Sequence, residues 1–349
     1  MRTKYFSFLH GITIASVLFF SCQTNNKENQ PIRIGWQAPL ATQGQVVEVM
    51  KNTNLLAQQG MTGEFNSFSY GGPQSEAALA GKLDVIFTGD QPIVNLLSKG
   101  GKWKIISRLF YTRTAVMVPL NSDIKTMGQF KGKTIACPFG SVAQRESILK
   151  EQAAGIEPAK DVTNLNVDIL EISNIVQAGG DKSWGNIDGI TVWEPSTSLF
   201  EAKKLARIID TTITLGVVAI SEDFITKHPT ETTKFLVSLI QSWDYFATHQ
   251  DEVNKWYLEN THFSYSPEIL KQASAVDPNI NAKSIGDIDL YLKQDHINTL
   301  KVAAQWALNQ KFTTTLVNVP DAIDQSFLER AEAIVKKDGF DVNSVKLNK

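Results

Sequence analysis

Residues 81–92, GKLDVIFTGDQP, join a largely apolar strand directly to the start of a helix. Residues 83–87 are typical of a buried strand, and Thr88-Gly89-Asp90 leads into a helix with Pro92 in its first turn. A strand that passes straight into a helix is the repeating unit of α/β proteins, whose ligands bind where the strands end. This stretch therefore predicts an α/β fold with a binding site at its strand-to-helix junctions.

The same alternation extends outward from this stretch in both directions. Strands are predicted at residues 32–36, 65–70, 115–118, 132–136, near 167–169, 190–193 and 214–220, with 207–210 ending one unit. Helices are predicted over residues 46–57 and 76–80, after Pro92, after Ser141 and from Pro229 onward. The pattern predicts a mostly parallel sheet with a helical C-terminal region.

Two α/β lobes account for this order of elements. We expect residues 31–118 and 215–349 to form one discontinuous lobe and residues 119–214 to form the other. The chain would then cross between the lobes near residues 119–125 and 210–216. In the helical region, one face is apolar throughout and is predicted to be core: Phe235, Leu236, Leu239, Ile240, Trp243 and Phe246.

The N-terminus is typical of an exported protein. Arg2 and Lys4 precede an apolar stretch over residues 5–20, and Ser21-Cys22 follows. A small residue before a cysteine, with the polar tract 23–30 after it, is similar to a bacterial lipoprotein signal. We expect residues 1–21 to be a signal peptide, Cys22 to be lipidated and residues 22–30 to tether a periplasmic, membrane-anchored domain. The alternative is a plain signal peptide or an N-terminal anchor with an incidental cysteine.

Composition excludes several classes of protein. The 349 residues include 42% hydrophobic and 20% charged residues, with a formal net charge of −2. Such a chain can bury two ordinary cores, and it has no general attraction for nucleic acid. If Cys22 is lipidated, Cys137 is left without a disulfide partner, and its apolar surroundings predict a buried thiol. We expect a monomer that does not bind nucleic acid.

The residues needed for catalysis are scarce. There is no G-x-S-x-G elbow, H-E-x-x-H, C-x-x-C, G-x-G-x-x-G or phosphate-binding loop motif. His10 lies in the predicted signal segment. The other histidines fall in the C-terminal helical region, away from the strand-to-helix loops: His228, His249, His262 and His296. We therefore expect no catalytic residues, no metal and no cofactor.

Small polar residues stand where strands pass into helices. Thr88-Gly89-Asp90 precedes one helix, and Gly140-Ser141 precedes another. The start of a helix exposes free N–H groups and a partial positive charge, so two such starts facing one cleft would bind a small anion. The alternative is that Asp90 and Ser141 only cap their helices.

Two aromatic residues follow predicted strands beside polar ones. Trp193-Glu194-Pro195 places an aromatic plane next to a carboxylate, and Trp36-Gln37 follows the first strand. Each tryptophan could cover the organic part of a ligand, with Glu194 accepting a hydrogen bond. The alternative is a tryptophan packed beneath the hinge with Glu194 in solvent.

Together these motifs resemble the nitrate/sulfonate/taurine-type substrate-binding proteins of ABC importers. The resemblance covers roughly residues 31–220. It rests on Gly72-Pro73 with Glu76-Ala77, the blocks 81–85 and 88–92, residues 130–133 with Gly140-Ser141, and residues 186–189 with Trp193-Glu194-Pro195. Residues 178–184 are longer and richer in glycine than the family pattern, and the cysteine-rich signatures of thiamine-linked relatives do not occur.

The resemblance implies a type II periplasmic binding fold whose lobes close on a small solute. It implies delivery of that solute to a membrane permease driven by an ATPase. With the residues chosen above, the predicted ligand-binding set is Trp36, Gln37, Gly72, Pro73, Thr88, Gly89, Asp90, Gly140, Ser141, Trp193 and Glu194.

Three alternatives remain open from the sequence. The ligand could be a pyrimidine or another neutral heterocycle, with Glu194 and Asp90 as hydrogen-bond acceptors. The chain could be a secreted enzyme on the same fold, as in thiamine-precursor synthesis. It could also be a sensor that delivers its bound solute to a membrane receptor.

Overall fold

The computed structural model describes Met1 and residues 30–348 of the chain. Apart from Met1, the predicted signal peptide lies outside the described residues, and so does Cys22. Residues Pro31–Lys349 form one compact unit. Within the described residues, no helix is both long enough and apolar enough to cross a membrane.

Eight strands of the described chain form one mixed sheet in the order β2-β1-β3-β8-β4-β7-β5-β6. The strands are β1 (Ile32–Gln37), β2 (Gly63–Phe68), β3 (Val85–Gly89), β4 (Trp103–Pro119), β5 (Thr134–Cys137), β6 (Thr163–Asn166), β7 (Gly189–Trp193) and β8 (Ala206–Ser221). Strand β1 is parallel to β2 and β3, and β5 is parallel to β6 and β7. The predicted α/β class is confirmed.

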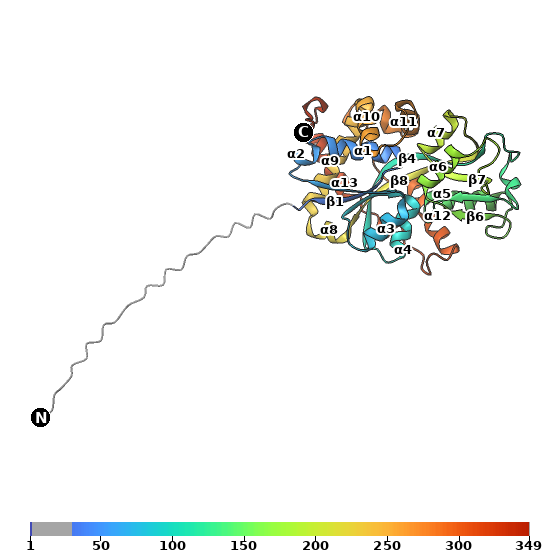
Figure 1. Cartoon of the computed structure of the whole chain (residues 1–349). Helices are drawn as coiled ribbons and strands as arrows, with labels where there is room; N and C mark the ends of the chain where they lie inside the picture. The colour runs from blue at the N-terminus through green and yellow to red at the C-terminus, as the bar shows by residue number, and fades with distance from the viewer. Residues whose placement is uncertain (2–29, 349) are drawn as a thin grey trace. The chain divides into compact units, whose positions relative to one another are not determined.

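Strands β4 and β8 join the two halves of the sheet. They pair antiparallel along nearly their whole length, from Trp103 opposite Ser221 to Pro119 opposite Ala206. One end of this ribbon lies beside β3 and the other beside β7. We call the part built on β1, β2 and β3 the first lobe and the part built on β5, β6 and β7 the second lobe (Figure 1).

These long strands correct two predictions. Residues 207–210 and 214–220 belong to one strand of 16 residues, and residues 115–118 are the end of a strand of 17. The polar stretch 211–214 suggested a break between two elements. It continues the strand because its β-branched threonines and isoleucine suit an extended chain paired with β4.

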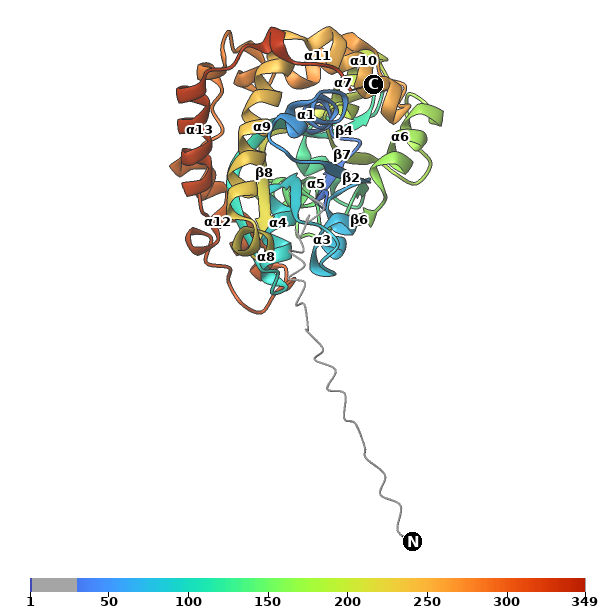
Figure 2. The ribbon, with the colours of Figure 1, turned by 90° about the vertical axis from the view of Figure 1, so that its left-hand side faces the viewer.

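The helices cover both faces of the sheet. They are α1 (Ala41–Asn52), α2 (Leu55–Gln58), α3 (Gly71–Leu79), α4 (Asp90–Ser98), α5 (Val142–Ala153), α6 (Ile169–Ala178), α7 (Ser196–Ala202), α8 (Glu222–Lys227), α9 (Pro229–Thr248), α10 (Gln250–Thr261), α11 (Pro267–Ser274), α12 (Gln294–Asn309) and α13 (Ser326–Asp338). The C-terminal region from α9 to α13 is helical, as predicted, and α13 packs along α9 (Figure 2).

Some helix starts differ from the prediction. Helix α1 begins at Ala41 rather than residue 46, and α3 begins at Gly71, where a break was expected. The strand predicted near 167–169 lies a few residues earlier, as β6, because Asp168 caps α6 by accepting a hydrogen bond from Leu170 N at 2.9 Å. Short polar side chains compete well for such free amides at a helix start, which ends the strand early.

The predicted core face of α9 is confirmed. All six of its apolar residues are buried, with at most 3% of any of them exposed. This face packs on α1 and α13, and α12 packs on α4. The C-terminal helices therefore form part of the core of the first lobe.

Candidate functional site

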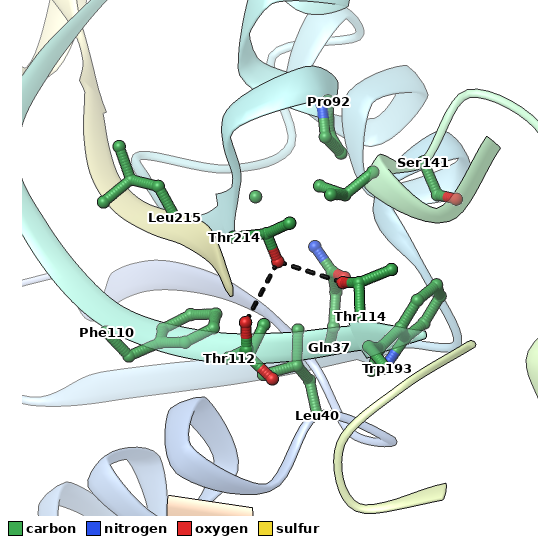
Figure 3. A pocket seen from close by; sticks show the side chains of 12 residues that line it. Gln37, Leu40, Pro92, Phe110, Thr112, Thr114, Ser141, Trp193, Thr214 and Leu215 are labelled. Carbon is green, nitrogen blue, oxygen red and sulfur yellow. Dashed lines mark hydrogen bonds between the residues drawn. The ribbon is translucent and has the colours of Figure 1, made fainter. Parts of the chain in front are cut away.

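A small cavity lies where β1, β3 and β7 end against the middle of β4 and β8 (Figure 3). The residues that line it are Gln37, Leu40, Gly89, Pro92, Phe110, Thr112, Thr114, Ser141, Val142, Trp193, Thr214 and Leu215. Its volume, measured for the centre of a water-sized sphere, is about 20 Å³. That space holds roughly one water, so a larger ligand requires the two lobes to separate.

Three helices begin at this cavity. Leu40, Gly89 and Ser141 are the residues that precede α1, α4 and α5, and all three line the cavity. The first amides of each helix have no partner within the helix and carry its partial positive charge. Neither Leu40 nor Gly89 caps its helix with a side chain. Three helix starts of the kind that bind anions therefore lie at one cavity.

Ser141 caps α5, as one of the two sequence interpretations expected. Its hydroxyl accepts a hydrogen bond from Gln144 N at 3.4 Å and donates one to Pro138 O at 2.6 Å. The neighbouring Gly140 has a φ of 76°, a conformation that favours glycine, and its N–H donates to the Gln144 side chain at 2.7 Å. The Ser141 hydroxyl proton is therefore engaged by a backbone carbonyl within the protein.

Gly89 allows the starts of α4 and α5 to approach closely. A Cβ atom at this position would lie 2.8 Å from Val142 Cγ2, nearer than real contacts allow. Gly89 belongs to the first lobe and Val142 to the second. The absence of a side chain here is therefore what lets the two lobes meet at the cavity.

Asp90 does not cap α4, since the cap position is Gly89 and Asp90 is the first helical residue. Its carboxylate forms a two-pronged ion pair with Arg145, at 2.8 and 3.0 Å, and Glu146 contacts the same guanidinium at 3.1 Å. Burial opposes the charge of Arg145, but Asp90 and Glu146 outweigh it and leave its pKa raised. The ion pair crosses from the first lobe to the second behind the cavity wall.

Glu194 is buried, so the interpretation that placed it in solvent is wrong. It accepts hydrogen bonds from Arg113 at 2.7 Å and from Ser198 N at 3.0 Å, and Arg113 also pairs with Glu201 at 2.8 Å. Burial opposes the charge of Arg113, yet the two carboxylates leave its pKa raised. Glu194 thus fixes the start of α7 and does not line the cavity.

The aromatic residues occupy different places. Trp193 lines the cavity, and its Nε1 donates to Pro39 O at 3.3 Å across the two lobes. Trp36 does not line it but packs beside Gly44 of α1, with Lys51 Nζ 5.6 Å from its ring centroid. Of the two predicted tryptophans, the structure therefore brings only Trp193 to the cavity.

The remaining predicted residues are Gln37, Thr88, Gly72 and Pro73. Gln37 lines the cavity, and its amide nitrogen donates to Gln74 at 3.0 Å and to Thr88 at 3.2 Å. Thr88 therefore holds Gln37 from behind. Gly72 and Pro73 lie in the first turn of α3 and do not line the cavity.

Sequence reasoning missed the middle of β4 and β8. Phe110, Thr112 and Thr114 alternate along β4 and line the cavity, and Thr214 and Leu215 line it from β8. Alternation of this kind marks one face of a strand. The alternating threonines Thr112 and Thr114 could have indicated this face. They were not recognised, because the strand was predicted to begin at residue 115.

The cavity wall is uncharged. None of its twelve residues has an ionisable side chain. Among residues 30–348, no three His, Cys, Asp or Glu side chains lie close enough together to hold a metal ion. Cys137 is buried, as predicted, and burial raises the pKa of its thiol. The side chains that this wall can offer a ligand are therefore amide, hydroxyl and apolar ones.

These features define a two-lobed α/β binding protein, and solved structures share the fold. The alkanesulfonate-binding protein SsuA from Xanthomonas axonopodis pv. citri, bound to MOPS, matches with a TM-score of 0.70 and 19% identity over 84% of this chain and 98% of its own. The desulfurization enzyme DSZB matches with a TM-score of 0.63 and 12% identity, over 87% of this chain and 99% of its own. The fold therefore serves both binding proteins and an enzyme.

The chain belongs to the NMT1/THI5-like family, whose model matches residues 56–253. A protein of Bacillus subtilis (strain 168) named for the binding of aliphatic sulfonates is 24% identical over 336 residues, which cover 92% of this chain and 96% of its own. The resemblance to substrate-binding proteins of the sulfonate type is thus confirmed at the level of family and fold.

Proposed function

We propose that this chain is the extracytoplasmic solute-binding component of an ABC importer and that it binds a small organic anion of the sulfonate, taurine or nitrate class. The observation that carries the proposal is the convergence of three helix starts on one cavity with apolar walls. The backbone amides would hold the oxyanion, and Leu40, Phe110 and Trp193 would cover the organic part. The names of the SsuA structure and of the Bacillus subtilis relative support the sulfonate class.

The charged residues near the site argue against the heterocycle alternative. That alternative used Asp90 and Glu194 as acceptors for a neutral ligand. Both carboxylates are engaged by Arg145 and Arg113 and neither lines the cavity. A pyrimidine in the cavity would therefore not find the two carboxylate acceptors on which this alternative was based.

We propose that Gln37, Gly89, Ser141 and Trp193 contact the ligand directly or through their backbone. The other members of the predicted set do not line the cavity: Trp36, Gly72, Pro73, Thr88, Asp90, Gly140 and Glu194. Their role in binding stays a prediction.

The lobe boundaries also stay a prediction. The change of strand partners supports them, because β8 pairs with β3 over Gly216–Ile220 and β4 pairs with β7 over Thr114–Met117. We propose that the first lobe, residues 31–118 and 215–349, and the second lobe, residues 119–214, separate to admit the solute. Closure then follows because the ligand contacts both lobes and so favours the closed state.

We propose that the chain binds without chemistry. The wall offers no general acid or base, and the Ser141 proton is directed at a backbone carbonyl rather than a base. An enzyme on the same fold would need such a group at the cavity. Incubation with ethanesulfonate followed by product analysis should return the ligand intact, and any turnover would exclude this part of the proposal.

Export and anchoring complete the proposal. We propose that residues 1–21 are removed, that Cys22 is diacylated and that the chain acts as a monomer beside its permease. Labelled palmitate should be incorporated into the wild-type chain and not into Cys22→Ala. Equal labelling of both chains would show that Cys22 is not the anchor. Genes for a permease and an ATPase beside this one would favour an importer over a sensor.

The test of ligand class is thermal unfolding of residues 23–349 with ethanesulfonate, taurine, nitrate, sulfate and a pyrimidine. A ligand that binds only the folded state adds about 2.7 kcal/mol of stability at a hundredfold excess over its Kd. We expect the sulfonate to raise the Tm. A rise with the pyrimidine alone would contradict the proposal while leaving the fold unchanged.

A further inference from the structure

Three threonines of the cavity differ in how their hydroxyl protons are used. The hydroxyls of Thr114 and Thr214 lie 3.0 Å apart, and Thr214 donates to the backbone oxygen of Thr112 at 3.3 Å (Figure 3). Because a hydroxyl has one proton, Thr214 cannot also donate to Thr114. Thr114 is therefore the donor in that pair, and both protons are committed within the protein.

The Thr112 hydroxyl, in contrast, donates no hydrogen bond within the described part of the protein. Its side chain lines the cavity with 5% of the residue exposed, and its oxygen has no hydrogen-bond partner among the described residues. Of the buried side-chain nitrogen and oxygen atoms without a partner in the described part of the chain, this one alone belongs to a residue of the cavity wall. A buried hydroxyl without a partner is costly, and its position requires a reason.

We propose that Thr112 donates its hydroxyl hydrogen bond to an oxygen of the bound ligand and is a specificity-determining residue of the site. Its position on β4 lies between the stretch where β8 pairs with β3 and the stretch where β4 pairs with β7. The Thr112 hydroxyl therefore belongs to the β4–β8 ribbon that joins the two lobes. The starts of α4 and α5 belong to the first and second lobe respectively. This inference rests on the proposed function, since it requires an oxygen-bearing ligand in the cavity.

The test compares Thr112→Val with Thr112→Ser and uses ethanesulfonate as the probe. Valine keeps the shape of threonine without the hydroxyl, and we expect its affinity to fall by about 10- to 100-fold, as for other bonds to charged groups. Serine keeps the donor and should bind within about threefold of wild type. Equal affinity of the valine variant and wild type would overturn the role of Thr112 alone.

Thr191→Val is the matched control. Thr191 is also a fully buried strand threonine whose hydroxyl has no partner among the described residues, but it does not line the cavity. This variant should bind ethanesulfonate as wild type does. Loss of affinity in both valine variants would overturn the inference, because the effect would not be specific to the cavity.

The ligand-free proteins give a second readout. Because the Thr112 hydroxyl has no partner, Thr112→Val should unfold at or above the wild-type Tm, as Thr191→Val should. A Tm lowered in Thr112→Val alone would show a structural partner and overturn the inference. If wild type binds none of ethanesulfonate, taurine and nitrate, the proposed function fails, and this comparison of Tm values still decides whether the hydroxyl is free.

Discussion

Asp90 and Ser141 occupy equivalent places in the sequence, each at the junction between a strand and a helix, but their side chains have different structural roles. Ser141 caps α5, whereas Asp90 leaves the cap to Gly89 and pairs with Arg145. The sequence could locate both junctions, because a strand followed by a helix start is a local pattern. It could not show that Arg145, 55 residues away, takes the Asp90 carboxylate.

The same limit applies to the rest of the site at the scale of residues. Gln37, Gly89, Ser141 and Trp193 were predicted from their positions after strands, and all four line the cavity. Glu194 was expected to face a ligand or solvent, but Arg113 binds it from a strand far away in sequence. Local position predicts where a backbone goes, while the partner of a buried charge depends on the tertiary fold.

Substitution of Gly89 tests the close approach of the starts of α4 and α5. Gly89→Ala places a methyl group against Val142 and should keep the starts of α4 and α5 apart. We expect ethanesulfonate affinity, measured by titration calorimetry, to fall by about tenfold or more, since about 1.4 kcal/mol of strain suffices for that change. The φ of −80° at Gly89 suits alanine, so the backbone itself is not strained.

Gly128→Ala is the control for this substitution. A Cβ at Gly128 meets nothing within 4 Å, so the variant should bind as wild type does. Unchanged affinity in Gly89→Ala would show that the α4 and α5 starts do not need this close approach.

At the scale of elements, the alternation of strands and helices was predictable and the long strands were not. Strands β1, β2, β3, β5 and β7 fall within a few residues of their predicted positions. Strands β4 and β8 stabilise each other along a shared ribbon, so polar residues such as Thr112 and Thr211 stay extended where a local pattern suggests a break. Pairing between distant strands overrides local propensity, and a single sequence does not reveal the pairing.

Helix α9 carries a prediction about pH. Asp244 on this helix is 5% exposed, its Oδ1 has no partner among the described residues, and burial raises the pKa of its carboxyl. A carboxyl whose folded-state pKa is raised stabilises the fold fully only below its unfolded pKa, near 4. That contribution is lost as the pH rises through the folded-state pKa.

Asp244→Asn should therefore raise the Tm at pH 7, by roughly 1–3 °C, and the gain should vanish below about pH 4. Scanning calorimetry from pH 3 to pH 8 measures this. Asp223→Asn, on helix α8 with a side chain that is 74% exposed, is the surface control and should change the Tm much less than Asp244→Asn does. A gain for Asp244→Asn that is the same at every pH would contradict burial of the charge as its cause.

At the scale of the whole molecule, direct contacts hold the two lobes together. Asp90 pairs with Arg145, the Asn95 side chain donates to Gly140 O at 3.1 Å, and Ser69 donates to Asp168 at 2.7 Å. These contacts and the small volume of the cavity indicate that the two lobes are closed on each other in this structure. Opening must break a buried ion pair, whose two charges then regain water.

Arg145→Met tests this closed arrangement. It leaves Asp90 buried and unpaired when the lobes are closed, a cost of about 3–5 kcal/mol, and opening relieves that cost. Spin labels at Glu76→Cys on α3 and Glu171→Cys on α6 flank the Ser69–Asp168 contact. In residues 23–349 the remaining cysteine, Cys137, is buried. We expect longer distances between the labels in Arg145→Met than in the protein with Arg145.

Arg33→Met provides the comparison for that experiment. It removes an ion pair to Asp84, at 2.6 Å, that lies within the first lobe. The distance between the labels should not change in this variant. If Arg145→Met gave the same distances as Arg33→Met, the ion pair between the lobes would not control closure.

The binding of an organic sulfonate, with its oxyanion in the cavity between the helix starts, can be tested by crystallography. A crystal structure with 2-bromoethanesulfonate tests it most directly, because anomalous scattering locates the sulfur and the bromine separately. We predict the sulfur at the starts of α4 and α5, with sulfonate oxygens in hydrogen-bonding reach of Val142 N and the Thr112 hydroxyl. The bromine should lie against Phe110 or Leu40. A sulfur position outside this cavity, or a cavity left without ligand at saturating concentration, would contradict the proposed binding site.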